Sequence, residues 1–153
     1  MKDVVMHQPE MVCIAARWIK TLEGMVTATR VLHSAETWNE RYSEPSFVFG
    51  TQLNAYLADK CVLIEPGKTA LAVADGEGRN SVWLAQQGLQ VDAFDISPVG
   101  VAKARQLAQQ ASVKVNYRVC SCDDWDWQPA AYDYVVAMCN LPIPTCARGF
   151  LRT

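Results

Sequence analysis

Short apolar runs and helical patterns alternate along most of this chain. Four apolar runs are typical of buried strands. The first begins at residue 69, and the other three cover residues 90–94, 114–119 and 134–138. A helix is expected directly after Gly78, where apolar residues recur at helical spacing. Residues 99–110, rich in alanine, leucine, lysine, arginine and glutamine, predict a second helix.

Residues that favour helix termini mark the ends of these elements. Gly88 suits the end of the first helix, and Ser97 followed by Pro98 suits the start of the second. Upstream, Ser34 or Thr37 is expected to cap a short helix, and Thr51 to cap a helix over 52–60.

Strands that alternate with helices predict an α/β fold with a parallel sheet and right-handed crossovers. The expected sheet is a partial Rossmann-like one, with strand order 3-2-1-4, flanking helices and a ligand at its carboxyl edge. The later strands of a full doubly wound sheet are missing, so we expect a C-terminally truncated form. An unpaired fourth strand would expose a sheet edge, through which two copies could associate.

Three segments are expected along the chain. Residues 1–33 show loose helical periodicity and predict a helical extension, whereas residues 34–140 form the cofactor-binding domain. Residues 141–153 have no pattern that would complete another helix and strand, and we expect an irregular tail.

Composition narrows the class of protein. The 153 residues suit one domain, and the net charge of −2 without a basic stripe argues against a nucleic-acid partner. The sequence has no apolar stretch long enough to cross a bilayer and no secretory signal pattern, so a cytoplasmic protein is expected. The six cysteines are then free thiols, and the spacing of Cys120 and Cys122 matches structural zinc poorly, so no metal is expected.

The most informative stretch is the turn GEGRN after the first predicted strand. Gly76 and Gly78 lack a Cβ atom, so the backbone can turn sharply and approach a ligand at the start of the next helix. Asp95 ends the second predicted strand, where a carboxylate can accept hydrogen bonds from both ribose hydroxyls of an adenosine. The alternative for Asp95 is to cap the helix that starts at Ser97.

Two adenosine cofactors share this geometry. A nicotinamide cofactor favours a third glycine, G-x-G-x-x-G, under its pyrophosphate, and Ser81 stands at that position here. S-adenosylmethionine has no phosphate and does not need that glycine. The sequence therefore favours S-adenosylmethionine, with a nicotinamide-binding Rossmann protein as the alternative.

The segments ETWNERYSEPSFVFGTQLNAYLAD, ALAVADGEGRNSVWLAQQGLQVDAFDISPVGVAKARQLA and DDWDWQPAAYDYVVA resemble class I S-adenosylmethionine-dependent methyltransferases. Within them, the closest resemblance is to the tellurite-resistance and thiopurine S-methyltransferase branch. The chain departs from the usual motif at Ala72, where the family has an acidic residue, and at Ala74, where it has its first glycine. The resemblance implies a cofactor site made of Ala74, Asp75, Gly76, Gly78, Asp95, Ile96, Ser121, Cys122 and Asp123.

The resemblance also implies methyl transfer to a small molecule such as a thiol, a thiopurine or a chalcogen oxyanion. Soft nucleophiles of this kind need no strong general base, so no catalytic residue is assigned. The aromatic residues Trp38, Tyr42, Phe47 and Phe49 either form a lid over the cofactor or cover a face of the sheet. A non-catalytic remnant that retains the cofactor half of the fold is the third hypothesis.

Overall fold

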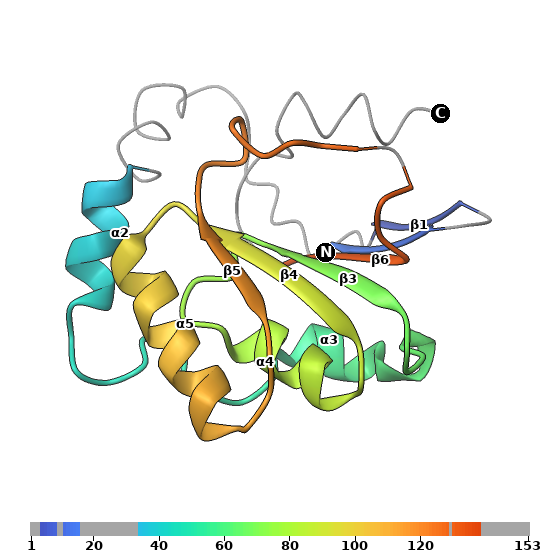
Figure 1. Ribbon diagram of the computed structural model, residues 1–153, viewed down its shortest axis with the longest axis horizontal. Coiled ribbons are helices and arrows are strands. Elements are labelled where there is room, and N and C mark those ends of the chain that lie inside the picture. Colours follow the sequence, from blue (N-terminus) through green and yellow to red (C-terminus); the bar gives the residue numbers. More distant parts are fainter. Residues whose placement is uncertain (1–3, 9–10, 16–33, 129, 139–153) are drawn as a thin grey trace.

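The computed structural model describes residues 4–8, 11–15, 34–128 and 130–138, the first two segments as backbone (Figure 1). A six-stranded sheet runs through it in the order β1-β2-β6-β3-β4-β5. The strands are β1 (Val4–Gln8), β2 (Met11–Ala15), β3 (Thr69–Val73), β4 (Gln90–Asp95), β5 (Asn116–Val119) and β6 (Tyr134–Ala137).

The predicted order 3-2-1-4 is confirmed. β3 pairs in parallel with β4 and with β6, and β4 pairs in parallel with β5, so β5-β4-β3-β6 is the expected set of strands. Their carboxyl ends lie at one edge, where the glycine turn and Asp95 follow β3 and end β4.

The expectation of a helical N-terminal extension is wrong where the structure describes it. β1 and β2 form an antiparallel hairpin, and β2 pairs in parallel with β6, Cys13 opposite Val135. The β-branched Val12 and Ile14 favour a strand, and so short an apolar run does not distinguish strand from helix by periodicity. The fourth predicted strand is therefore paired on both sides. It has no exposed edge of the kind that was expected to allow two copies to associate. The predicted tail 141–153 lies outside the described residues.

Most of the helices lie against one face of the sheet, and the first of them packs against the last (Figure 1). The helices are α2 (Ala35–Tyr42), α3 (Ala55–Asp59), the short 3₁₀ helix η1 (Cys61–Leu63), α4 (Arg79–Gln86) and α5 (Pro98–Gln110). Ser97 caps α5 as expected, and its hydroxyl accepts a hydrogen bond from Gly100 N at 3.0 Å. Ser34 rather than Thr37 caps α2. Asn54 rather than Thr51 caps α3, because the Asn54 side chain accepts from Tyr56 N at 2.9 Å.

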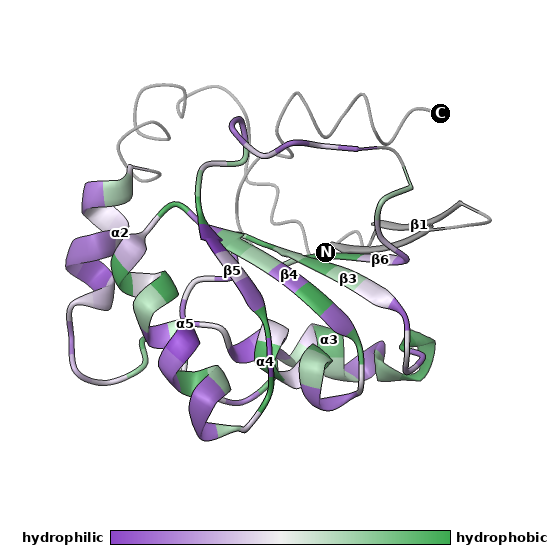
Figure 2. Ribbon diagram, viewed as in Figure 1, coloured by the Kyte–Doolittle hydropathy of each residue, from purple (hydrophilic) through white to green (hydrophobic). Residues whose placement is uncertain are grey.

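Alternate residues of β3 divide the core between the two faces. Ala70 and Ala72 belong to the clusters that α3, α4 and α5 complete, so the helices pack closely on small side chains. Leu71 and Val73 face the other way, where Phe94 stacks on Trp125 with ring centroids 4.5 Å apart. Trp125, Trp127 and Tyr132, which follow β5, pack on this second face, so β3 is apolar between two covered surfaces, whereas the edge strand β5 is largely hydrophilic (Figure 2).

Within the described part of the chain, no helix has the length and hydropathy that crossing a membrane requires.

Candidate functional site

The turn between β3 and α4 is held in a conformation that glycine favours. The φ angle is +62° at Gly76 and +91° at Gly78, and Ala74 also lies in the left-handed region at +49°. A Cβ atom on residue 78 would stand 2.7 Å from Ala104 Cβ in α5, so this glycine is also required for close packing of α4 and α5.

Asp75 turns its carboxyl group toward the start of α4. Its two oxygens accept from the backbone N–H of Ser81 at 3.2 Å and from the Ser81 hydroxyl at 2.5 Å. That hydroxyl also lies 2.9 Å from the Tyr117 hydroxyl. Desolvation raises the pKa of Asp75 to about 7, against the opposing effect of the Ser81 hydrogen bonds. Ser81, at the position of the absent third glycine, thus anchors a buried polar network beneath the turn.

Asp95 joins the end of β4 to the glycine turn. One carboxylate oxygen accepts from Gly76 N at 2.9 Å, and the other accepts from Ser97 N at 2.9 Å. The contact to Ser97 is the helix-start interaction weighed as the alternative to ribose binding. Each oxygen has further lone-pair capacity for a ligand hydroxyl, so the two functions are compatible. Burial raises the pKa of Asp95.

The candidates on the adenine side lie at the same edge of the sheet. Cys120 N donates to Asp95 O at 3.0 Å, which places the end of β5 beside the end of β4. In the turn that follows, the Ser121 hydroxyl donates to Asp124 at 2.6 Å, and the carbonyl of Cys122 accepts from the Trp127 indole at 2.8 Å. Asp123 is exposed, and Ile96 is half-buried next to Asp95. The structure therefore brings these predicted residues to one edge, and their contact with a cofactor stays a prediction.

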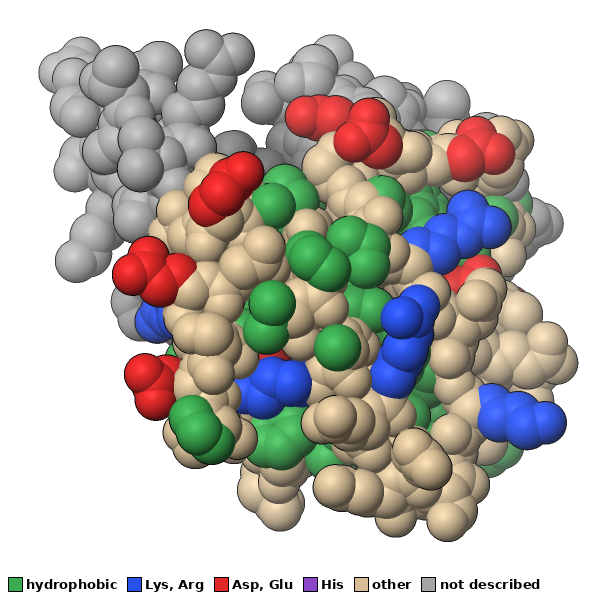
Figure 3. Space-filling model, turned by 60° about the vertical axis from the view of Figure 1, so that its left-hand side comes forward, with side chains coloured by type: hydrophobic (Ala, Val, Ile, Leu, Met, Phe, Trp, Pro, Cys, Tyr) green, Lys and Arg blue, Asp and Glu red, His purple; other side chains and the backbone are tan. Residues whose placement is uncertain are grey.

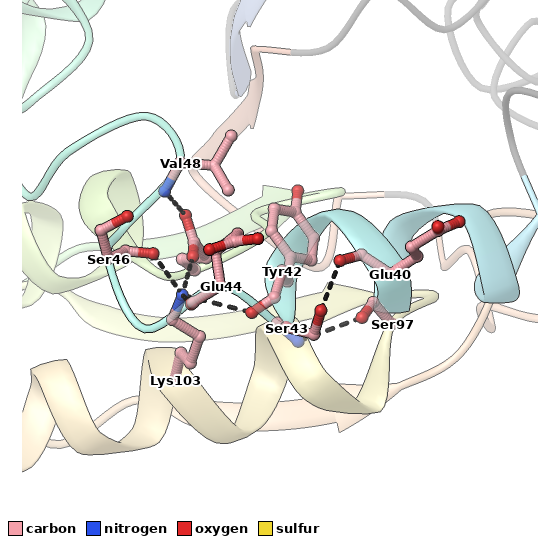
Figure 4. Close-up of polar contacts among 10 residues, drawn as sticks. Glu40, Tyr42, Ser43, Glu44, Ser46, Val48, Ser97 and Lys103 are labelled. Atoms are coloured by element: carbon pink, nitrogen blue, oxygen red, sulfur yellow. Dashed lines mark hydrogen bonds and ion pairs between the residues drawn. The ribbon is translucent and has the colours of Figure 1, made fainter.

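Two charged residues at the site were not predicted from the sequence. Glu77, between the two glycines, is buried, and its carboxylate lies 2.5 Å from Lys103 Nζ on α5. A charged residue inside a buried turn needs an opposite charge nearby. The acidic residue between two glycines was therefore the feature of the sequence that could have indicated an ion pair. Lys103 also donates to backbone carbonyls of the segment after α2 (Figure 4).

Tyr42 and Phe49, two of the aromatic residues expected to form a lid or to cover the sheet, differ in their surroundings, and a lid over the cofactor stays a prediction. Tyr42 is buried and lies over the turn, with its hydroxyl 2.6 Å from the position of a Cβ on residue 76. Burial, with the carboxylates of Asp95 and Glu77, raises its pKa, so the hydroxyl keeps its proton. Phe49 is exposed and stacks with the guanidinium groups of Arg41 and Arg79 at 5.3 Å and 5.5 Å from its ring centroid.

Acidic and basic side chains both lie near the turn. Asp75, Glu77 and Asp95 surround the glycines, Lys103 pairs with Glu77, and the charge of Arg79 lowers the pKa of Asp75. On the face drawn in Figure 3, the basic side chains lie apart from one another among hydrophobic and polar ones.

These residues fit S-adenosylmethionine. Asp95 offers a buried carboxyl group to the ribose at the carboxyl edge of the sheet, and the Ser81 donors that a pyrophosphate would need are already bonded to Asp75. Among the described residues, no group of three or more potential metal ligands gathers.

Comparisons with known proteins agree with this assignment. The chain is 39% identical over 84 residues to the ubiquinone biosynthesis O-methyltransferase of Xanthomonas campestris, across 54% of this chain and 34% of that protein. It thus spans about a third of the length of the curated relatives it matches.

Two solved structures share the fold. TehB from Haemophilus influenzae has a TM-score of 0.50 at 18% identity, with 67% of this chain and 33% of that chain covered. A structure described as the conversion of a disulfide bond into a thioacetal group during echinomycin biosynthesis has a TM-score of 0.54 at 24% identity, covering 72% and 46%.

The profile of the family described as "Methyltransferase domain" matches residues 70–152, which is more than half of the chain. The expected cofactor is confirmed, since the family uses S-adenosylmethionine. The chain therefore belongs to the methyltransferase domain family and is a class I S-adenosylmethionine-dependent methyltransferase domain.

Proposed function

We propose that this domain transfers a methyl group from S-adenosylmethionine to a small-molecule acceptor with a soft nucleophilic atom. The observation that supports it best is the start of α4, where a nicotinamide cofactor would place its pyrophosphate. The Asp75 carboxyl group already accepts from the backbone N–H and from the hydroxyl of Ser81, so these donors are not free for a phosphate, and S-adenosylmethionine carries none.

The chemistry that S-adenosylmethionine supplies when bound is an activated methyl group on a sulfonium. The protein's own residues then bind and align the two reactants and exclude water. Asp95 would hold the ribose and orient the cofactor, while Tyr42 would cover the turn.

The residues near the turn support a soft acceptor. Both histidines of the chain, His7 and His33, precede residue 34, so residues 34–138 contain none to act as a general base. The carboxyl groups of Asp75 and Asp95 already accept backbone hydrogen bonds. A thiolate, a thiopurine or a reduced chalcogen needs no base, as in the tellurite-resistance and thiopurine branch that the sequence resembles.

Titration calorimetry of the full chain with S-adenosylhomocysteine and with NADH tests the cofactor half of this proposal. Saturable binding of S-adenosylhomocysteine alone supports it. Binding of NADH alone would instead favour the nicotinamide alternative, and binding of neither would favour the non-catalytic remnant.

The acceptor is tested with methyl-labelled S-adenosylmethionine and matched thiol and phenol acceptors. We expect label on the thiol and not on the phenol. Transfer to the phenol alone would contradict a soft acceptor and would agree with the O-methylation named for the Xanthomonas relative.

A further inference from the structure

The segment that starts at Tyr42, the last residue of α2, leads past the glycine turn to Val48. We call residues 42–48 the strap. Residues 43–46 are exposed, so the strap depends on a few fixed points for its conformation. Its first residue, Tyr42, is buried between the turn and α5, where Cβ atoms on residues 76 and 100 would both meet it.

Lys103 on α5 is the first of these fixed points. Its Nζ donates to Ser46 O at 2.7 Å, to Glu44 O at 2.9 Å and to Tyr42 O at 3.3 Å, and it lies 5.0 Å from the centroid of the Phe47 ring (Figure 4). One ammonium group therefore holds three carbonyls of the strap together.

Glu77 is the second fixed point, and it belongs to the cofactor turn itself. One oxygen lies 2.5 Å from Lys103 Nζ, and the other accepts from Val48 N at 2.8 Å. The side chains of Glu77 and Lys103 are 3% and 13% exposed, so solvent screens this ion pair little. Glu77 thus contacts both Val48, at the end of the strap, and Lys103, which donates hydrogen bonds to carbonyl groups within the strap.

We propose that Glu77 and Lys103 are positioning residues that hold the strap, and with it the Tyr42 ring, against the cofactor turn. This inference rests on the proposed function, because it assigns the pair to cofactor binding beyond the stability of the fold. If either charge is removed, the strap loses its fixed points, Tyr42 leaves Gly76, and the cofactor is held less tightly.

The test compares S-adenosylhomocysteine binding by four variants of the full chain. Lys103→Met and Glu77→Gln should each weaken binding at least tenfold. Val48→Pro removes the single N–H that the strap donates to Glu77, at the second position of a turn closed by Gly50 N to Phe47 O, where proline is favoured. We expect Val48→Pro to unfold near the wild-type denaturant midpoint and still to bind about fivefold more weakly.

The matched control is Arg105→Met, which removes a cation of the same helix that donates to Tyr117 O and not to the strap. It should bind S-adenosylhomocysteine within twofold of wild type. Hydrogen exchange supplies a local readout, because ligand should slow exchange of the Val48 amide in wild type and in Arg105→Met, but not in Lys103→Met.

The outcomes separate the two proposals. If the wild-type chain does not bind S-adenosylhomocysteine, the proposed function fails. The positioning inference is overturned if the wild type binds, if Lys103→Met and Val48→Pro bind as tightly as Arg105→Met, and if the ligand still protects the Val48 amide in Lys103→Met.

Discussion

The hydroxyl group of Tyr42 lies so close to Gly76 that a Cβ atom on residue 76 would stand 2.6 Å from it and 3.3 Å from the ring carbon that bears it. Gly76→Ala should therefore destabilise the fold by about 3 kcal/mol, from overpacking and from the positive φ of +62°. Chemical denaturation measures this loss.

Tyr42→Phe provides the matching test, since it removes the closer of these two atoms. In the Gly76→Ala background it should restore about 1 kcal/mol, whereas alone it should change stability little. Strictly additive effects of the two substitutions would contradict the contact.

Ala74→Gly should stabilise the protein by about 0.5 kcal/mol. A left-handed alanine costs about 1–2 kcal/mol, and the extra freedom of glycine in the unfolded chain offsets part of the gain. Ala72→Gly in β3 is the control and should destabilise the protein, because the backbone at Ala72 is extended and its side chain is buried. A loss of stability in Ala74→Gly, measured by urea denaturation, would contradict strain at this position.

Asp75 should make stability fall as pH rises toward neutrality. Burial raises its pKa from 3.8 to about 7 in the folded state, so between these values the folded chain holds a proton that the unfolded chain has released. The contribution of Asp75 to the free energy of unfolding is fully present below pH 4. It falls by about 1.4 kcal/mol per pH unit as the pH rises from the unfolded to the folded pKa of this group.

Asp75→Asn should remove this slope while its amide still bonds to Ser81. Guanidinium denaturation at pH 5, 6, 7 and 8 checks it, with Asp133→Asn as the control because the pKa of Asp133 is lowered instead. An unchanged slope in Asp75→Asn would assign the pH dependence to another group, such as Asp95.

Asp95→Ala should weaken S-adenosylhomocysteine binding at least about tenfold, because two hydrogen bonds from ribose hydroxyls to a carboxylate would be lost. Asp92→Asn is the control, since Asp92 lies in the same strand and bonds to Tyr132 and Asn116. Calorimetry compares the two variants. Equal affinities would remove Asp95 from the cofactor site.

The order of the four strands β5-β4-β3-β6 could be predicted because it depends on local signals. Each parallel strand is a short apolar run, Gly88 and Ser97 end and begin helices, and right-handed crossovers leave few arrangements. The proximity of the glycine turn and Asp95 could be predicted from the same strand order, since neighbouring parallel strands place their carboxyl ends at one edge of the sheet.

The interactions around the turn could not be predicted in the same way. Lys103 meets Glu77 only because α5 docks beside α4, and the strap reaches both through backbone groups that carry no sequence signal. Likewise, Met11–Ala15 becomes a strand because an edge of β6 is available to it, and its own five residues do not distinguish strand from helix.

The position of β6 has a consequence for how the chain folds. This strand is the last described along the sequence, yet it lies between β3 and β2 and separates the amino-terminal hairpin from the rest of the sheet. During synthesis, the only described strand with which β2 can pair is β1 until residues 134–137 leave the ribosome, and pairings between such distant segments form slowly. The nascent chain would expose two unpaired strand edges until the moment when β6 inserts between them.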